Sequence, residues 1–118
     1  MNSTTSIPKN KQLTALADGL PALYQLIEKY TGGPIRTDFR QFVTVSKMEL
    51  VEYLRHNPAL AEKHVMSENE ALHLHDHPVL LNENGKWLVC WIDHETKTNK
   101  VYFDDLSEAA ANFLMAYW

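Results

Sequence analysis

Six consecutive apolar residues, Trp87 to Ile92, follow the dipeptide Asn84-Gly85 and constrain the fold more than any other feature of the sequence. Asn-Gly tolerates the positive φ angles of a tight hairpin turn, and the apolar segment Val79-Leu80-Leu81 before it supplies a partner strand. Because successive side chains of a strand face opposite sides, the run from Trp87 to Ile92 makes both of its faces apolar. We therefore expect it to be the central strand of a sheet.

A third strand and a closing helix are expected after this hairpin. A polar turn from His94 to Asn99 leads to Val101-Tyr102-Phe103, whose β-branched and aromatic residues are typical of a strand. Asp105 and Glu108 then form a capping-box pattern. The apolar residues after it follow helical spacing: Leu106, Ala109, Ala110, Phe113, Leu114 and Tyr117.

The N-terminal part of the chain is predicted to be helical. From Leu13 to Tyr30, apolar residues recur at the spacing of an amphipathic helix. Gly19 and Pro21 interrupt the pattern, and because proline lacks a backbone N–H we expect a kink, or two abutting helices with Pro21 in the first turn of the second. Gly32-Gly33-Pro34 ends the helix with a left-handed glycine cap. Residues 1–10 are polar and are expected to form a flexible tail.

The segment between these helices and the sheet mixes two signals. Phe39 to Val45 is aromatic and β-branched, which predicts a short strand. Ser46 and Glu49 form a capping box for a helix that stops at Asn57-Pro58. Ala59 to Val65 is expected to add a further helical turn.

Residues 66–77 carry conflicting patterns. Ser67 and Glu70 form a second capping box, which favours helix from Glu68 to His73. The alternation of histidines that follows favours an extended chain instead. The sequence leaves the conformation of this segment open.

Length, composition and cysteine content place these elements in one small protein. With 118 residues, of which 45% are apolar and 22% charged, the chain has the profile of one globular domain. We expect an α+β fold over residues 11–118: a small, mainly antiparallel sheet with N-terminal helices and a closing C-terminal helix. A lone cysteine excludes an intramolecular disulfide, and the sequence shows neither a secretory signal nor a membrane-spanning run, so a cytoplasmic protein is expected.

Charge is distributed unevenly and suggests a type of partner. Residues 1–60 contain seven basic and five acidic side chains, whereas residues 61–118 contain four and ten. An acidic half disfavours nucleic acid and favours a basic protein surface. The carboxylates in or beside turns are the candidate contact residues: Asp76, Glu83, Asp93 and Glu95. Trp118, at the C-terminus, either caps the core or lies exposed, and in the second case it is a further candidate contact residue.

Three histidines raise the question of a metal. His73, His75 and His77, with Asp76 among them, are ligand types that zinc prefers. In an extended segment the three imidazoles would share one face, about 6–7 Å apart, which is awkward for tetrahedral closure. We therefore expect a polar connection without metal, and keep a catalytic metal site at these residues as an alternative.

The remaining chemistry-bearing residues do not form a catalytic motif. Cys90 lies within the apolar strand, where a thiol behaves as a small hydrophobe. The sequence contains neither a Gly-x-Ser-x-Gly motif nor a glycine-rich phosphate loop. We expect a protein that is not an enzyme and needs no cofactor.

The order of the C-terminal segments resembles a known class of proteins. The hairpin Gly85-Lys86-Trp87-Leu88-Val89-Cys90-Trp91, then Val101-Tyr102-Phe103-Asp104-Asp105, then Leu106-Ser107-Glu108-Ala109-Ala110, is similar to segments of bacterial immunity proteins from contact-dependent inhibition and related polymorphic toxin systems. The resemblance covers about residues 78–118. It implies a cytoplasmic protein that binds and neutralises one cognate toxin domain, often a basic nuclease. The alternatives are a small metal-dependent hydrolase and a phage or host regulatory protein that binds another protein.

Overall fold

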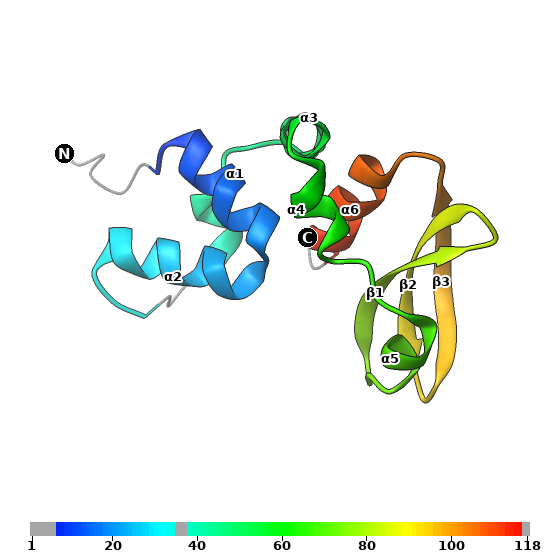
Figure 1. Cartoon of the computed structure of the whole chain (residues 1–118). Coiled ribbons are helices and arrows are strands. Elements are labelled where there is room, and N and C mark those ends of the chain that lie inside the picture. Colours follow the sequence, from blue (N-terminus) through cyan, green and yellow to red (C-terminus); the bar gives the residue numbers. More distant parts are fainter. Residues whose placement is uncertain (1–6, 35–37, 117–118) are drawn as a thin grey trace.

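The computed structural model describes residues 7–34 and 38–116. The strands form one antiparallel sheet in the order β1-β2-β3, and α6 is the only described helix that follows them in the chain (Figure 1). The expected α+β class, with N-terminal helices and a closing helix, is confirmed. The elements are α1 (Lys9–Asp18), α2 (Leu20–Thr31), the 3-10 helix η1 (Phe39–Phe42), α3 (Lys47–His56), α4 (Pro58–Glu62), α5 (Glu68–Leu72), β1 (His77–Glu83), β2 (Lys86–Asp93), β3 (Thr96–Phe103) and α6 (Leu106–Leu114).

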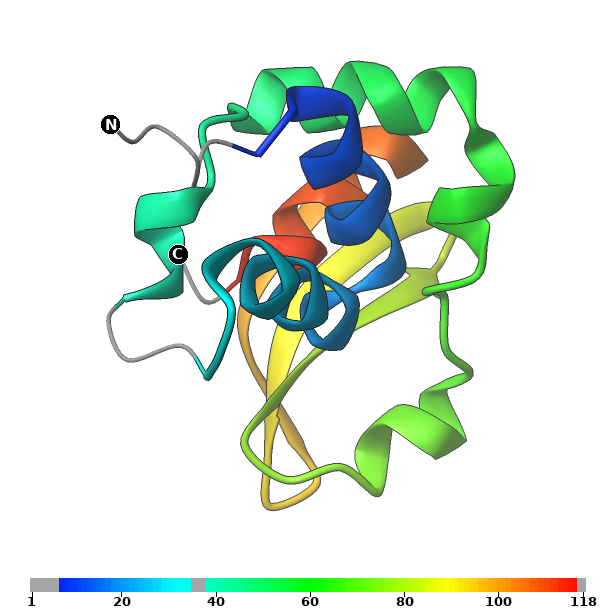
Figure 2. The ribbon, with the colours of Figure 1, turned by 90° about the vertical axis from the view of Figure 1, so that its left-hand side faces the viewer.

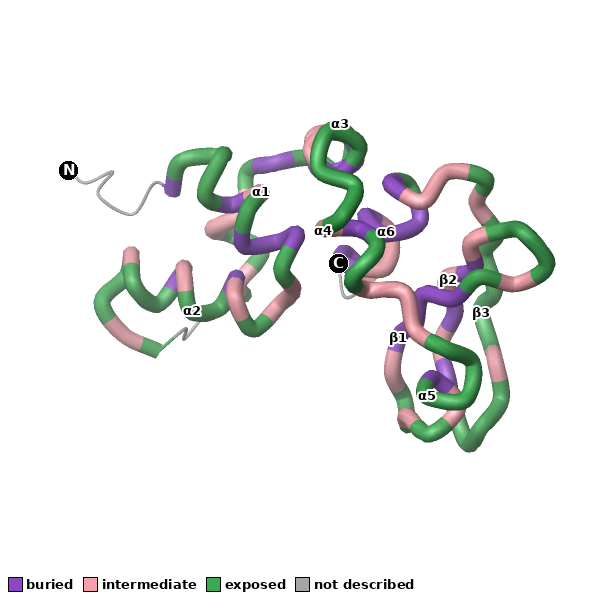
Figure 3. Tube along the Cα trace, viewed as in Figure 1, coloured by how far each residue is buried: buried purple, intermediate pink, exposed green. Residues whose placement is uncertain are grey.

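Strand β2 lies at the centre of the sheet, as the apolar run predicts. Its residues Leu88, Cys90 and Ile92 are buried on one face of the sheet. Trp87 and Val89 pack on the opposite face, against the larger core. Figure 3 shows that β1 and β2 consist mainly of buried and half-buried residues, whereas β3 is mostly exposed.

Two layers of helix cover the two faces of the sheet. On one side, α6 contacts all three strands and also α1, α3 and α4, so it lies between the sheet and the N-terminal helices (Figure 2). On the other side, Ala71 of α5 packs against the second core. That core contains Val79, Leu81, Leu88, Cys90 and Ile92.

Gly19 separates the two N-terminal helices. Its φ angle of 124° ends α1 and begins α2, and Pro21 lies in the first turn of α2. The prediction of two abutting helices is therefore confirmed. Gly32, with a φ of 82°, caps the end of α2 in the left-handed conformation that favours glycine.

The structured part begins earlier than the boundary expected at residue 10. Helix α1 starts at Lys9, and Ile7 is buried in the core. The side chain of Gln12 explains this anchoring, because it is fully buried and its Nε2 donates to the Ile7 carbonyl at 2.8 Å. Residues 1–6 of the expected tail lie outside the described residues.

The strand predicted for Phe39 to Val45 is wrong. Residues 39–42 form η1, where Asp38 caps the turn by accepting from the Arg40 N–H. The N–H groups of Thr44 and Val45 then donate to Gln12 Oε1, at 2.7 and 3.3 Å, in place of a neighbouring strand. A buried side chain from α1 thus satisfies the backbone donors that a sheet would have used.

The capping-box patterns predict the starts of all three helices correctly, and the complete box forms at two of them. Ser46 with Glu49 begins α3, and Ser67 with Glu70 begins α5. At α6, Asp105 accepts from the Ser107 N–H, but its other oxygen accepts from Arg55 at 2.6 Å. Asp105 is thus the N-cap of α6 as predicted, without the complete box expected with Glu108.

The second hairpin is tighter than the predicted turn from His94 to Asn99. Strand β3 already begins at Thr96, so His94 and Glu95 alone form the turn. Asn99 instead lies at an irregularity within β3, where the register against β2 shifts between Val89 and Trp91. Its φ of 52° is typical of the residue that forms a β-bulge.

Candidate protein-binding site

The turn between β2 and β3 presents charged side chains on a backbone that few residues favour. His94 and Glu95 have φ angles of 51° and 64°. Positive φ at both central residues is the geometry of the type I′ turn, which favours Asn-Gly. A side chain in this region costs about 1–2 kcal/mol, because its Cβ approaches the following carbonyl oxygen. The turn therefore holds Asp93, His94 and Glu95 outward at a conformational cost.

Asp76 lies next to this turn. His77 pairs with Ile92 in the β1-β2 register, which brings the preceding Asp76 beside Asp93. Asp76 also has a positive φ, 49°, and its side chain is exposed. We call Asp76, Asp93 and Glu95 the acidic tip, because all three are exposed at the same end of the sheet.

The acidic tip lacks basic partners within the described residues. Among the described residues Asp76 and Glu95 form no ion pair, and the ion pair of Asp93 is with the imidazole of His94, at 3.5 Å. By contrast, most other carboxylates of the described chain are paired with a lysine or arginine: Asp18, Asp38, Glu49, Glu52, Glu68, Glu83, Asp104 and Asp105. The negative potential of the tip is therefore available to an external cation.

Lys97, which follows the same turn in β3, forms its ion pairs with other carboxylates. Lys97 pairs in register with Ile92, but its ammonium contacts Glu68 at 2.5 Å and Glu83 at 2.7 Å. Only 15% of the Lys97 side chain is exposed. These two carboxylates raise the pKa of Lys97 well above its usual range, so it remains charged and held away from the tip.

Glu83 is therefore not part of the tip. It lies at the opposite end of β1, where its two oxygens accept from Lys97 and from the Tyr102 hydroxyl, each at 2.7 Å. Hydrogen bonds from Lys97 and then Tyr102 lower the pKa of Glu83. Of the four predicted contact carboxylates, the structure brings three together and gives the fourth an internal role. Trp118, the fifth predicted contact residue, lies outside the described residues.

The histidine segment does not form the extended face on which a three-imidazole site depends. His73 follows the last turn of α5 and its Nδ1 donates to the Asn69 carbonyl at 2.7 Å. His75 is exposed in a bend, and only His77 belongs to a strand. Within residues 7–34 and 38–116, no group of three or more histidine, cysteine or acidic side chains is placed to hold a metal ion.

His77 faces a small cleft away from the other two histidines. The cleft, about 220 Å³, is also lined by His64, Phe113 and the Gly19 junction. His77 Nδ1 donates to the Pro78 carbonyl at 2.6 Å, and His64 Nε2 donates to the Ala17 carbonyl at 2.7 Å. Each imidazole thus has one ring nitrogen committed to the backbone.

Cys90 is a core residue, as the sequence predicts. Its exposed fraction is 1%, and burial raises the pKa of its thiol. A buried, protonated thiol is a poor nucleophile. The ion pairs of Lys97 with Glu68 and Glu83 are not evident from the sequence, because a lysine in an expected turn is normally solvated.

Comparisons with known proteins do not identify a relative of this chain. Neither protein-family models, nor curated proteins, nor solved structures give a match to this chain. Among the described helices, none combines the length and apolar character needed to cross a membrane.

Proposed function

We propose that this chain is a non-enzymatic protein inhibitor that binds a basic partner through the acidic tip. The observation that carries the proposal is the set of three neighbouring carboxylates without a lysine or arginine partner in the described chain. All three side chains are exposed, and two of them, Asp76 and Glu95, lie on backbone with positive φ angles. A prearranged negative surface speeds encounter with a cationic protein and selects against acidic ones.

The resemblance of the C-terminal segments indicates the kind of partner. It supports an immunity protein that neutralises a cognate toxin domain by one-to-one binding. A nuclease domain must attract phosphates and therefore presents a basic surface, which the acidic tip complements. In this role the protein would act in the cytoplasm, where such a toxin reaches its substrate.

The first test is co-purification with a defined partner. The chain is expressed with the C-terminal domain of the protein encoded immediately upstream, and only that domain carries a tag. We expect a one-to-one complex, together with growth of cells that produce the domain. If the chain neither co-elutes nor protects, the immunity proposal is wrong.

A pair of charge variants tests whether the tip makes the contact. Asp93→Lys with Glu95→Lys reverses two charges at the tip, and Glu28→Lys with Glu62→Lys makes the same net change on α2 and α4. Glu28 and Glu62 are exposed and form no ion pair among the described residues. Loss of protection in the tip variant alone supports the proposal. Equal protection by both variants would place the contact elsewhere and point to a different inhibitory surface.

A further inference from the structure

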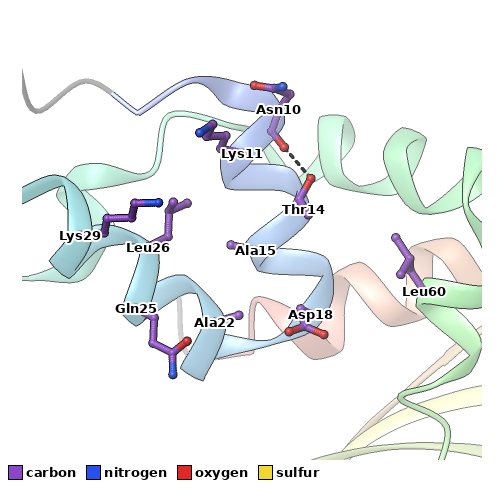
Figure 4. Close-up of a pocket in the computed structure, with 10 residues that line it drawn as sticks. All are labelled: Asn10, Lys11, Thr14, Ala15, Asp18, Ala22, Gln25, Leu26, Lys29 and Leu60. Atoms are coloured by element: carbon purple, nitrogen blue, oxygen red, sulfur yellow. Dashed lines mark hydrogen bonds between the residues drawn. The ribbon is translucent and has the colours of Figure 1, made fainter.

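A second surface lies between α1 and α2, and none of its lining residues belongs to the acidic tip. It is an open groove of about 520 Å³ that also reaches Leu60 of α4 (Figure 4). Its floor is apolar and consists of Ala15, Ala22, Leu26 and Leu60. Two of these side chains, the alanines, are small. Small residues on a helix surface let another backbone approach closely.

The rim of this groove is basic. Lys11 and Lys29 both line it, and neither has a carboxylate partner among the described residues. Lys11 instead lies 6.0 Å from the centre of the Tyr30 ring. The only acidic lining residue, Asp18, is paired with Lys63. The groove therefore combines an apolar floor with two cations that have no counterion within residues 7–34 and 38–116.

The surroundings of the groove decide which ligand class it suits. It is built from helices, so it presents no strand edge whose free N–H and C=O groups could hydrogen-bond an extended peptide. The exposed large apolar residues of the described chain, Tyr24, Met48, Val101 and Tyr102, all lie outside its lining, so it has no apolar anchor for a bilayer. A helix satisfies its own backbone and needs only an apolar floor and complementary charges.

We propose that the groove between α1 and α2 docks an acidic amphipathic helix of a partner protein. The apolar face of that helix packs on Ala15, Ala22 and Leu26, and its flanking carboxylates reach Lys11 and Lys29. This surface shares no lining residue with the acidic tip, although Asp18 at its edge also lines the cleft that His77 faces. The protein thus offers two surfaces of opposite charge, and the second does not depend on the toxin proposal.

A designed peptide tests the groove directly. The probe has about four turns of helix, long enough to follow α1, with leucines on one face and glutamates beside them. It is titrated into the isotopically labelled full chain while backbone amide shifts are recorded. We expect saturable shifts on α1 and α2 and none at the tip. A matched peptide with lysine in place of each glutamate should bind about tenfold more weakly.

Two sets of variants distinguish docking from general charge attraction. Lys11→Glu with Lys29→Glu should weaken binding of the acidic peptide about tenfold. Lys47→Glu with Lys100→Glu changes the net charge equally outside the groove and should leave binding unchanged. Ala22→Trp, which fills the floor, should also abolish binding, with folding checked by circular dichroism.

Three results would overturn the proposal. The first is the absence of saturable shifts on α1 and α2. The second is an equal loss of binding in both lysine double variants. The third is binding of anionic phospholipid vesicles through Lys11 and Lys29 without any binding of the peptide, which would assign the groove to a membrane surface.

Discussion

The two hairpin turns of the sheet have the same backbone geometry but different residues. Asn84-Gly85 reaches φ angles of 55° and 83°, and His94-Glu95 reaches 51° and 64°. The first pair favours these angles, whereas Glu95 carries a Cβ that opposes them. The first turn therefore serves to join β1 and β2. The second accepts a less favourable conformation, and its side chains belong to the surface that we propose for binding.

The link between the two hairpins should have the largest effect on stability. Lys97 of the second hairpin contacts Glu83, which ends β1 beside the first turn, and Glu68 of α5. We predict that Lys97→Met lowers the free energy of unfolding by about 1–2 kcal/mol, because Glu83 keeps only its hydrogen bond from Tyr102 and the more exposed Glu68 loses its ion-pair partner. Urea denaturation measures this. Lys100→Met removes an exposed lysine of the same strand and should change stability little.

Substitutions at the two turns should change the free energy of unfolding by a smaller amount. The change should be destabilising at the first turn and stabilising at the second. We predict that Gly85→Ala destabilises the protein by about 1 kcal/mol, because alanine is strained at a φ of 83°. His94→Asn with Glu95→Gly should stabilise it by about 1 kcal/mol, since the second turn then has the residues of the first. Thermal unfolding compares the two variants. If both variants are destabilised equally, His94 and Glu95 are not strained relative to Asn84 and Gly85, and the comparison of the two turns is wrong.

The same turn exchange should weaken binding while it strengthens the fold. The variant His94→Asn with Glu95→Gly keeps the turn but removes one carboxylate of the acidic tip. We predict a dissociation constant for the basic partner about three- to tenfold higher than that of the unmodified protein. Isothermal titration calorimetry measures it. Unchanged affinity would show that Glu95 is not a contact residue.

The smallest expected effect is the pH dependence of the stability that Glu83 contributes. The pKa of Glu83 is lowered in the folded state, chiefly by Lys97, so its stabilising contribution is present above the unfolded pKa. That contribution is lost as pH falls through the lower folded value. We therefore predict that Glu83→Gln is less stable than the unmodified protein at neutral pH and that the gap narrows below about pH 4.5. A gap that stays constant down to pH 3 would contradict the assignment.

Local signals in the sequence predicted much of the fold. The Asn84-Gly85 turn, the apolar run of β2, the break at Gly19 and Pro21 and two capping boxes all depend on residues close together in the chain. The strand expected at Phe39 to Val45 failed because its outcome depends on Gln12, more than thirty residues away. A glutamine in an amphipathic helix gives no sign that it will be fully buried.

The candidate site was predicted in part, for a related reason. Turn positions correctly suggested exposure for Asp76, Asp93 and Glu95, since turns lie at the surface. Exposure alone does not show which carboxylates lack a counterion. Glu83 also lies beside a turn, but it is at the other end of β1, and its contacts with Lys97 and Tyr102 are not evident from the sequence.

The association rate with the co-purified partner tests the central claim most directly. Stopped-flow rates at several salt concentrations are compared for the unmodified protein, the tip variant Asp93→Lys with Glu95→Lys, and the control Glu28→Lys with Glu62→Lys. We predict that the tip variant associates about tenfold or more slowly at low salt and loses most of its salt dependence, while the control changes far less. Equal slowing of both variants would mean that net charge alone steers the encounter, and would contradict a binding role for the acidic tip.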